Sequence, residues 1–158
     1  MKRALVVAVM AVMVASVPRP AVAGFALNFS IGEGVDVGSG GALHRGRFNL
    51  EAIPAWSFDL DPAFLSVDLG FHFFAEPPVE LTLRPGVRIG LKWIYARGAI
   101  PLKVNNGFDW GFLLGLGSEF ISWGPLGLFL EADTFFTRDR DWVNPVAIEF
   151  RFGLALRL

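Results

Sequence analysis

Hydrophobic and polar residues alternate with a period of two along most of the chain after Gly24. The pattern is clearest at the C-terminus, where every second position from Ile148 to Leu158 is apolar and the positions between include Glu149, Arg151 and Arg157. Successive side chains of a strand point to opposite faces, whereas a helix would scatter these residues around its circumference. The C-terminal segment is therefore predicted to be a strand.

Seven earlier segments follow the same alternation, and every charge within them falls opposite the apolar face. The apolar faces of these seven predicted strands are Phe25–Ile31, Phe48–Phe58, Leu65–Phe73, Leu81–Leu91, Ile94–Val104, Phe108–Leu116 and Leu126–Phe136. Together with the last segment they predict an all-β protein of eight strands.

The composition of the two faces indicates which solvent each one meets. The apolar face is built mostly of large side chains, while the charged face also carries many glycines, among them Gly70, Gly86, Gly115 and Gly153. Small residues suit the crowded interior of a narrow barrel, and a surface facing water has no such need. The pattern therefore predicts an eight-stranded antiparallel up-and-down transmembrane β-barrel with its charges inside.

The connections between the predicted strands alternate between short turns and longer loops, as in bacterial barrels with both termini in the periplasm. The predicted turns lie at Asp61-Pro62, Lys92-Trp93 and Trp123-Gly124-Pro125. The predicted loops are Gly32–Arg45, Ala75–Pro78, Asn105–Gly107 and Thr137–Asn144.

The five tryptophans are predicted to form two interfacial belts. Trp56, Trp93 and Trp123 lie at or near the three turns, and Trp110 and Trp142 lie near the opposite ends of their strands. Tryptophan is enriched at both membrane–water interfaces, so this placement favours a bilayer-spanning barrel.

The N-terminal residues 1–23 have the features of a secretory signal peptide. Lys2 and Arg3 precede an apolar run from Ala4 to Val17, and Ala21-Val22-Ala23 offers small residues for cleavage near Ala23. The run is short for a membrane anchor that stays attached. The predicted division is a signal peptide over 1–23 and an outer-membrane β-barrel over 24–158.

Composition excludes several other classes of protein. The chain is 53% hydrophobic, yet no later stretch reaches the roughly 18 uninterrupted apolar residues of a membrane helix. The absence of cysteine rules out disulfides, thiolate metal sites and lipoprotein acylation. The acidic balance of the mature chain gives no support for a nucleic-acid partner, and no motif for a metal or another cofactor is found.

The interior charges are mixed in sign, which predicts ion pairs that fill the lumen, because buried charges need partners. Four arginines are expected to pair with four carboxylates near mid-depth: Arg84, Arg88, Arg97 and Arg151 with Glu51, Asp68, Glu131 and Glu149. An ion pathway is the alternative, and one sign of charge would then dominate.

On these patterns the mature chain resembles the small eight-stranded outer-membrane β-barrel proteins, such as the OmpA membrane domain, OmpX and Ail. The resemblance implies an outer-membrane location in a Gram-negative bacterium, contact with lipids and lipopolysaccharide, and recognition by the outer-membrane assembly machinery. It also implies an assembly signal in the last strand, for which the matching residues are Phe150, Phe152, Leu154, Leu156 and Leu158. Leu158 departs from the usual terminal Phe.

The predicted function is non-enzymatic, with an envelope-structural or surface-interaction role and an unknown extracellular ligand. Lipid A-modifying enzymes also occur among such barrels, but neither His44 nor His72 has a serine two residues away. A lipid-modifying enzyme, a narrow-pore channel and a soluble periplasmic lipid-binding barrel remain the alternatives.

Overall fold

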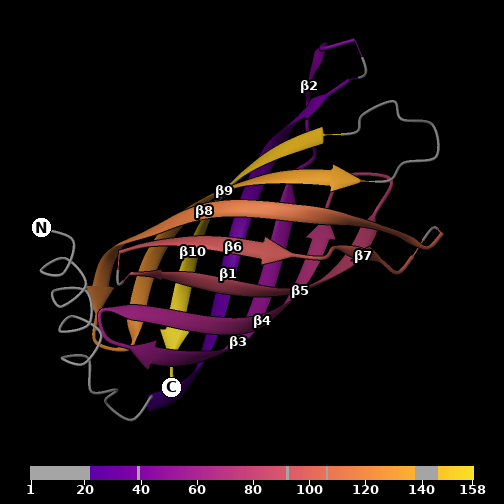
Figure 1. Ribbon diagram of the computed structural model, residues 1–158. Coiled ribbons are helices and arrows are strands. Elements are labelled where there is room, and N and C mark those ends of the chain that lie inside the picture. The colour runs from indigo at the N-terminus through magenta and orange to yellow at the C-terminus, as the bar shows by residue number, and fades with distance from the viewer. Residues whose placement is uncertain (1–21, 39, 92, 106, 138–145) are drawn as a thin grey trace, which may run out of the picture.

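The computed structural model describes residues 22–38, 40–91, 93–105, 107–137 and 146–158. They form one antiparallel sheet that closes on itself (Figure 1). The strands are β1 Val22–Val37, β2 Leu43–Arg45, β3 Asn49–Leu60, β4 Ala63–Phe74, β5 Glu80–Leu91, β6 Ile94–Ala99, β7 Leu102–Lys103, β8 Asp109–Trp123, β9 Leu126–Thr137 and β10 Val146–Arg157. Within the described ranges, no helix is long and apolar enough to cross a membrane.

Eight strands form the wall of the barrel, as the alternation predicts. β6 and β7 make one wall strand, since both pair with β5 and with β8. The interruption lies at Ile100 and Pro101, where a proline has no N–H to donate to the ladder. β2 stands outside the wall and pairs with β1 alone.

The barrel closes where the first and last strands meet. β1 and β10 pair without a break from Ala26 opposite Arg157 to Val37 opposite Val146. The amide of Arg157 also donates to the carbonyl of Pro125, which brings the end of the chain beside the turn between β8 and β9. Among the strands that the structure describes, no free edge therefore remains in the wall, and an exposed edge in lipid would leave backbone polar groups unpaired.

The first strand is longer than its apolar face predicts. The prediction of a loop over Gly32–Arg45 is wrong for residues 32–37, which continue β1, and for β2, which folds back on them. Glycine is weak evidence for a strand, and Gly32 and Gly34 hide the continuing alternation. Glu33 lies on the exterior side two residues beyond Ile31, where it pairs with Arg45.

The wall is apolar on the outside. Leu114 of β8 has 64% of its surface exposed while its neighbour Leu113 has 1%. The same contrast runs through the sheet, with exposed Phe150 and Phe152 on β10 either side of buried Arg151. This arrangement suits a protein surrounded by hydrocarbon and not by water.

Several predictions concern residues outside the described part of the chain. They are residues 1–21 of the predicted signal peptide, Trp142, and residues 138–144 of the predicted loop Thr137–Asn144. Val22 and Ala23 are part of β1, opposite Asp59 and Phe58. Cleavage near Ala23 stays a prediction.

Candidate functional site

The middle of the lumen is filled by charged side chains from six strands. Nine of them are at most 6% exposed and are defined here as the ion-pair layer: Glu51, Asp68, Arg84, Arg88, Arg97, Glu131, Asp133, Glu149 and Arg151. The layer contains five carboxylates and four guanidinium groups. Its members come from β3, β4, β5, β6, β9 and β10, so it spans the barrel from wall to wall.

Arg97 lies at the centre of the layer and contacts three carboxylates. Its Nη2 is 3.0 Å from Glu51 Oε1 and 3.2 Å from Asp68 Oδ1, and its Nη1 is 3.2 Å from Glu131 Oε1. These carboxylates come from β3, β4 and β9, so a single planar guanidinium links both sides of the barrel.

Arg84 contacts the carboxylate of Glu149 through both of its terminal nitrogens. Nη1 lies 3.0 Å from Glu149 Oε2 and Nη2 lies 3.2 Å from Glu149 Oε1, the geometry of a bidentate arginine–carboxylate pair. Nη1 is also 3.4 Å from Glu51 Oε2, and the head group lies 5.3 Å from the centre of the Phe135 ring. No surface of the Arg84 side chain is exposed.

Arg88 and Arg151 complete the layer. Arg88 Nε is 3.3 Å from Asp68 Oδ2 and its Nη2 is 3.8 Å from Glu131 Oε2. Arg151 pairs with Glu51, Glu131 and Asp133. Each arginine therefore faces at least two carboxylates or a bidentate one, as charges removed from water require.

The structure brings together all eight residues that the sequence groups in the lumen, and His72, which the alternation also predicts to face the lumen, lies with them. It adds two contacts that the sequence does not predict, those of Asp133 and Tyr95. Asp133 lies on the predicted inner face and pairs with Arg151. Tyr95 donates a 2.7 Å hydrogen bond from its hydroxyl to Glu131 Oε2. His72 is fully buried, with Nε2 3.7 Å from Glu149 Oε1. The alternation that places Arg97 and Asp68 inside also places Tyr95 and His72 inside, so the signal was present.

Inward-facing glycines make room for the layer. A Cβ added at Gly70 would lie 2.1 Å from Glu51 Oε1, and one at Gly115 would lie 1.9 Å from Asp133 Oδ1. Both distances are far below any van der Waals contact. The small residues of the charged face therefore act as spaces into which side chains of neighbouring strands extend.

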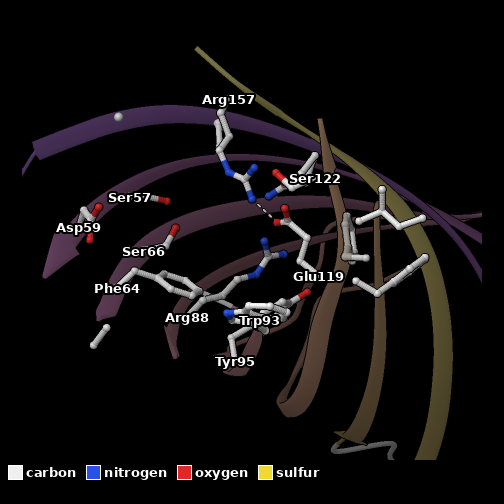
Figure 2. A pocket seen from close by; sticks show the side chains of 18 of the residues that line it. Ser57, Asp59, Phe64, Ser66, Arg88, Trp93, Tyr95, Glu119, Ser122 and Arg157 are labelled. Carbon is white, nitrogen blue, oxygen red and sulfur yellow. Dashed lines mark hydrogen bonds and ion pairs between the residues drawn. The ribbon is translucent and has the colours of Figure 1, made fainter. Parts of the chain in front are cut away.

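A cavity of about 660 Å³ lies on one side of the layer, at the end of the barrel that carries the short turns. We call it the turn-end cavity (Figure 2). Pro62 and Trp93 lie at its mouth, and buried Ser66 and Arg88 lie deeper. Arg157, near its edge, pairs with Glu119.

A smaller cavity of about 240 Å³ lies towards the opposite end, where β1 and β2 project beyond the wall. Glu80 is central to its lining, because Lys103 Nζ lies 2.7 Å from its Oε1 and Arg47 Nη2 lies 2.8 Å from its Oε2. Glu149 lines this cavity, whereas Arg88 lines the turn-end cavity. The ion-pair layer therefore separates the two.

The projecting hairpin is tied to the neighbouring connection. Arg45 pairs with Glu33 across the hairpin and, at 3.2 Å, with Glu76 between β4 and β5. The hydrogen bond and the charge of Glu33 raise the pKa of the Arg45 guanidinium, which stays protonated. Leu43, at the start of β2, is 70% exposed.

The predicted signal residues and Trp56, Trp110 and Trp123 lie on the outer wall, whereas Trp93 lies in the turn at the mouth of the turn-end cavity. Trp93 is 74% exposed in this turn between β5 and β6, and Trp123 is 64% exposed at the end of β8. Trp56 packs against Phe25 with ring centres 5.1 Å apart, and Trp110 packs against Phe112 at 5.3 Å. In β10, the predicted assembly-signal positions alternate with the lumen residues Arg151 and Gly153.

No known protein family and no curated protein sequence matches the chain. Among solved structures, the chain is similar to the crystal structure of Neisserial surface protein A (NspA), with a TM-score of 0.57 and 11% identity over 87% of this chain and 99% of that one. A de novo designed transmembrane β-barrel gives a TM-score of 0.45 at 13% identity, over 83% and 95% of the respective chains. The likeness to NspA supports the fold alone, a closed eight-stranded antiparallel β-barrel.

Proposed function

We propose that this chain is a non-enzymatic integral protein of the outer membrane of a Gram-negative bacterium, with an envelope-structural or surface-interaction role. The proposal includes a lumen closed by ion pairs, cleavage of the signal peptide, and contact of the outer wall with lipids and lipopolysaccharide. It also includes delivery by the outer-membrane assembly machinery through the signal in β10.

One observation carries the proposal: a fully buried layer of opposite charges crosses a barrel whose outer wall is apolar. An ion pathway would need one dominant sign of charge and a continuous opening. The layer has five carboxylates against four guanidinium groups, and every member is at most 6% exposed. These features support a closed lumen in preference to the narrow-pore alternative.

Planar-bilayer conductance measurements test whether the lumen is closed to ions. The purified barrel is expected to give no stable channels. The double variant Glu51→Ala/Arg97→Ala removes two contacting groups from the centre of the layer, so it serves as a positive control that is expected to conduct. Large stable channels from the unaltered barrel would count against the proposal.

The enzymatic alternative is weakened by the surroundings of the buried histidine. The His72 side chain has no exposed surface and faces Glu149, so a lipid ester has no access to it. The exposed His44 lies in β2, outside the barrel wall. The enzymatic alternative is tested by comparing the masses of lipid A from a deletion strain and from its parent. A changed acyl composition would require catalysis.

Membrane insertion is tested by gel mobility and fractionation. Closed outer-membrane barrels resist SDS until heated, so the boiled and unboiled protein are expected to migrate differently. Release into the periplasmic fraction without detergent would favour the soluble lipid-binding barrel instead. The projecting β1–β2 hairpin, with exposed Leu43 and His44, is the surface on which we place an extracellular contact.

A further inference from the structure

The turn-end cavity has the size and the mixed lining of a small-molecule site. Its volume of about 660 Å³ lies within the roughly 300–1,000 Å³ range of ligand pockets. Ala26, Phe64, Phe129 and Ala155 supply apolar wall. The Phe64 and Tyr95 rings meet edge to face with centres 6.3 Å apart, so part of the wall is rigid and aromatic.

Arg88 lines the cavity and has hydrogen-bonding capacity that the protein leaves unused. Its side chain is 7% exposed, and its head group points towards the Arg157–Glu119 pair (Figure 2). Among the described residues, neither its Nε nor its Nη2 has a hydrogen-bond acceptor. Its ion-pair contacts to Asp68 and Glu131, at 3.3 and 3.8 Å, are not hydrogen bonds. A buried guanidinium gains from an added acceptor oxygen.

The charges next to the Arg88 head group disfavour an ionic ligand of either sign. Asp59 also lines the cavity, but it lies on the exposed edge, where it accepts a hydrogen bond from the amide of Asp61. Arg157 already pairs with Glu119, and Arg88 already faces Asp68 and Glu131. An added anion would increase the carboxylate excess of the ion-pair layer, and an added cation would meet the Arg88 head group without water to screen it. Nε and Nη2 face Asp68 and Glu131, and a neutral oxygen acceptor on the cavity side of the Arg88 head group would add a hydrogen bond without changing the charge balance.

We propose that the turn-end cavity binds a small uncharged amphipathic molecule. Its aromatic or short aliphatic body lies against Phe64, Tyr95 and Phe129, and its acceptor oxygen lies at Arg88. The inference does not depend on the role of the barrel in the envelope, because it rests only on the cavity and the adjoining side chains.

Three probes that differ only in their head group test this: 4-phenylbutanamide, 4-phenylbutanoate and 4-phenylbutylammonium. Each is titrated calorimetrically into the barrel in phosphatidylcholine nanodiscs near neutral pH, and empty nanodiscs are subtracted. The amide is expected to bind roughly tenfold more tightly than either ion, because burying an uncompensated charge costs more than burying an amide. A preference for the carboxylate or the ammonium overturns the proposed ligand class.

Matched variants locate the binding. Ala155→Phe fills the cavity from β10 away from the ion-pair layer and is expected to weaken amide binding by about tenfold or more. Ala132→Phe places the same side chain on the exposed outer wall and is expected to leave binding unchanged. Equal binding by the unaltered barrel and Ala155→Phe would mean that the probe partitions into lipid, and the site would be refuted.

Arg88→Lys tests the role of the head group. Lysine keeps the charge facing Asp68 and Glu131 but loses the planar set of donors, so amide affinity is expected to fall about tenfold. Unchanged affinity overturns the role of Arg88. The heat-dependent gel mobility of each variant reports whether it has folded, and if Arg88→Lys fails to fold, Ala155→Phe still decides whether the site exists.

Discussion

Single glycines set how closely the inner side chains of neighbouring strands approach. At Gly153, an added Cβ would lie 2.3 Å from Cζ of Phe129 and 2.5 Å from the backbone oxygen of Phe29. Gly98 is in the opposite situation, since a Cβ there would meet no atom within 4 Å. Both residues are glycines, and they differ in the free space that an added Cβ would find. They therefore form a matched pair.

Gly153→Ala is expected to lower the free energy of unfolding by about 1–3 kcal/mol, because a backbone carbonyl and a packed ring must shift. Gly98→Ala is expected to change it by less than about 0.5 kcal/mol. Urea unfolding in lipid vesicles measures both. Equal destabilisation by the two variants would show that space inside the lumen is not the cause.

The buried arginines provide a second comparison at this scale. Arg84→Met leaves Glu149 buried without its bidentate partner and is expected to cost about 3–5 kcal/mol of stability. Arg45→Met removes a side chain that is 69% exposed, and no measurable change in the unfolding midpoint is expected. If both variants unfold at the same urea concentration as the parent, the layer does not stabilise the barrel.

The sequence predicts which face a residue occupies more readily than which partner it meets. Alternation places Glu51, Asp68 and Arg84 inside, but the ion pairs that each one forms depend on how far each strand is shifted along its neighbours. The register sets Gly70 opposite Arg84 and His72 opposite Glu51, and no local pattern fixes that shift. For the same reason the sequence predicts the face of Asp133 but not its pairing with Arg151.

At the scale of the strand, β8 offers a direct test of inside and outside. Leu113 and Leu114 are adjacent and chemically identical, yet they are 1% and 64% exposed. The chain has no cysteine, so a single introduced cysteine reports its own position. Leu114→Cys is expected to react with a lipid-soluble maleimide in the folded barrel, and Leu113→Cys only after denaturation. The reverse order would place the apolar face in a protein core and contradict the barrel.

Strand ends were harder to predict than strand faces. The break between β6 and β7 follows from Pro101, whereas Pro54 and Pro85 lie within β3 and β5 without ending them. Proline removes one donor, and whether a strand continues depends on its neighbours, which the local sequence does not reveal. β8 likewise runs on to Trp123 past a register shift between Glu119 and Ile121, well beyond the predicted face ending at Leu116.

For the whole molecule, the decisive contact is the one between the first and last strands. Leu27 and Leu156 are register partners across that junction. In the double variant Leu27→Cys/Leu156→Cys, a disulfide is expected to form, because paired strand positions fall within the separation that a disulfide spans. Cross-linked chains migrate differently on gels after boiling without reductant. Leu27→Cys/Leu154→Cys, two residues out of register, is the control, and more efficient cross-linking there would refute the observed closure.

The number of strands and the location of the charges could be predicted from the sequence, because both follow from a period of two. The cavities could not. Their volumes depend on how deep Arg88, Tyr95 and Phe129 lie relative to one another, which requires the register of several strands at once.

The distribution of the ion-pair layer along the chain bears on how the protein enters a bilayer. β3 to β6 contribute three arginines of the layer and two of its carboxylates. β9 and β10 contribute one arginine, Arg151, and the other three carboxylates. Each half on its own would carry unmatched charge into hydrocarbon, at a cost of several kcal/mol per ion. We therefore expect the two halves to insert together, and we expect two separately made halves to restore the heat-dependent gel mobility of the barrel only when they are refolded together.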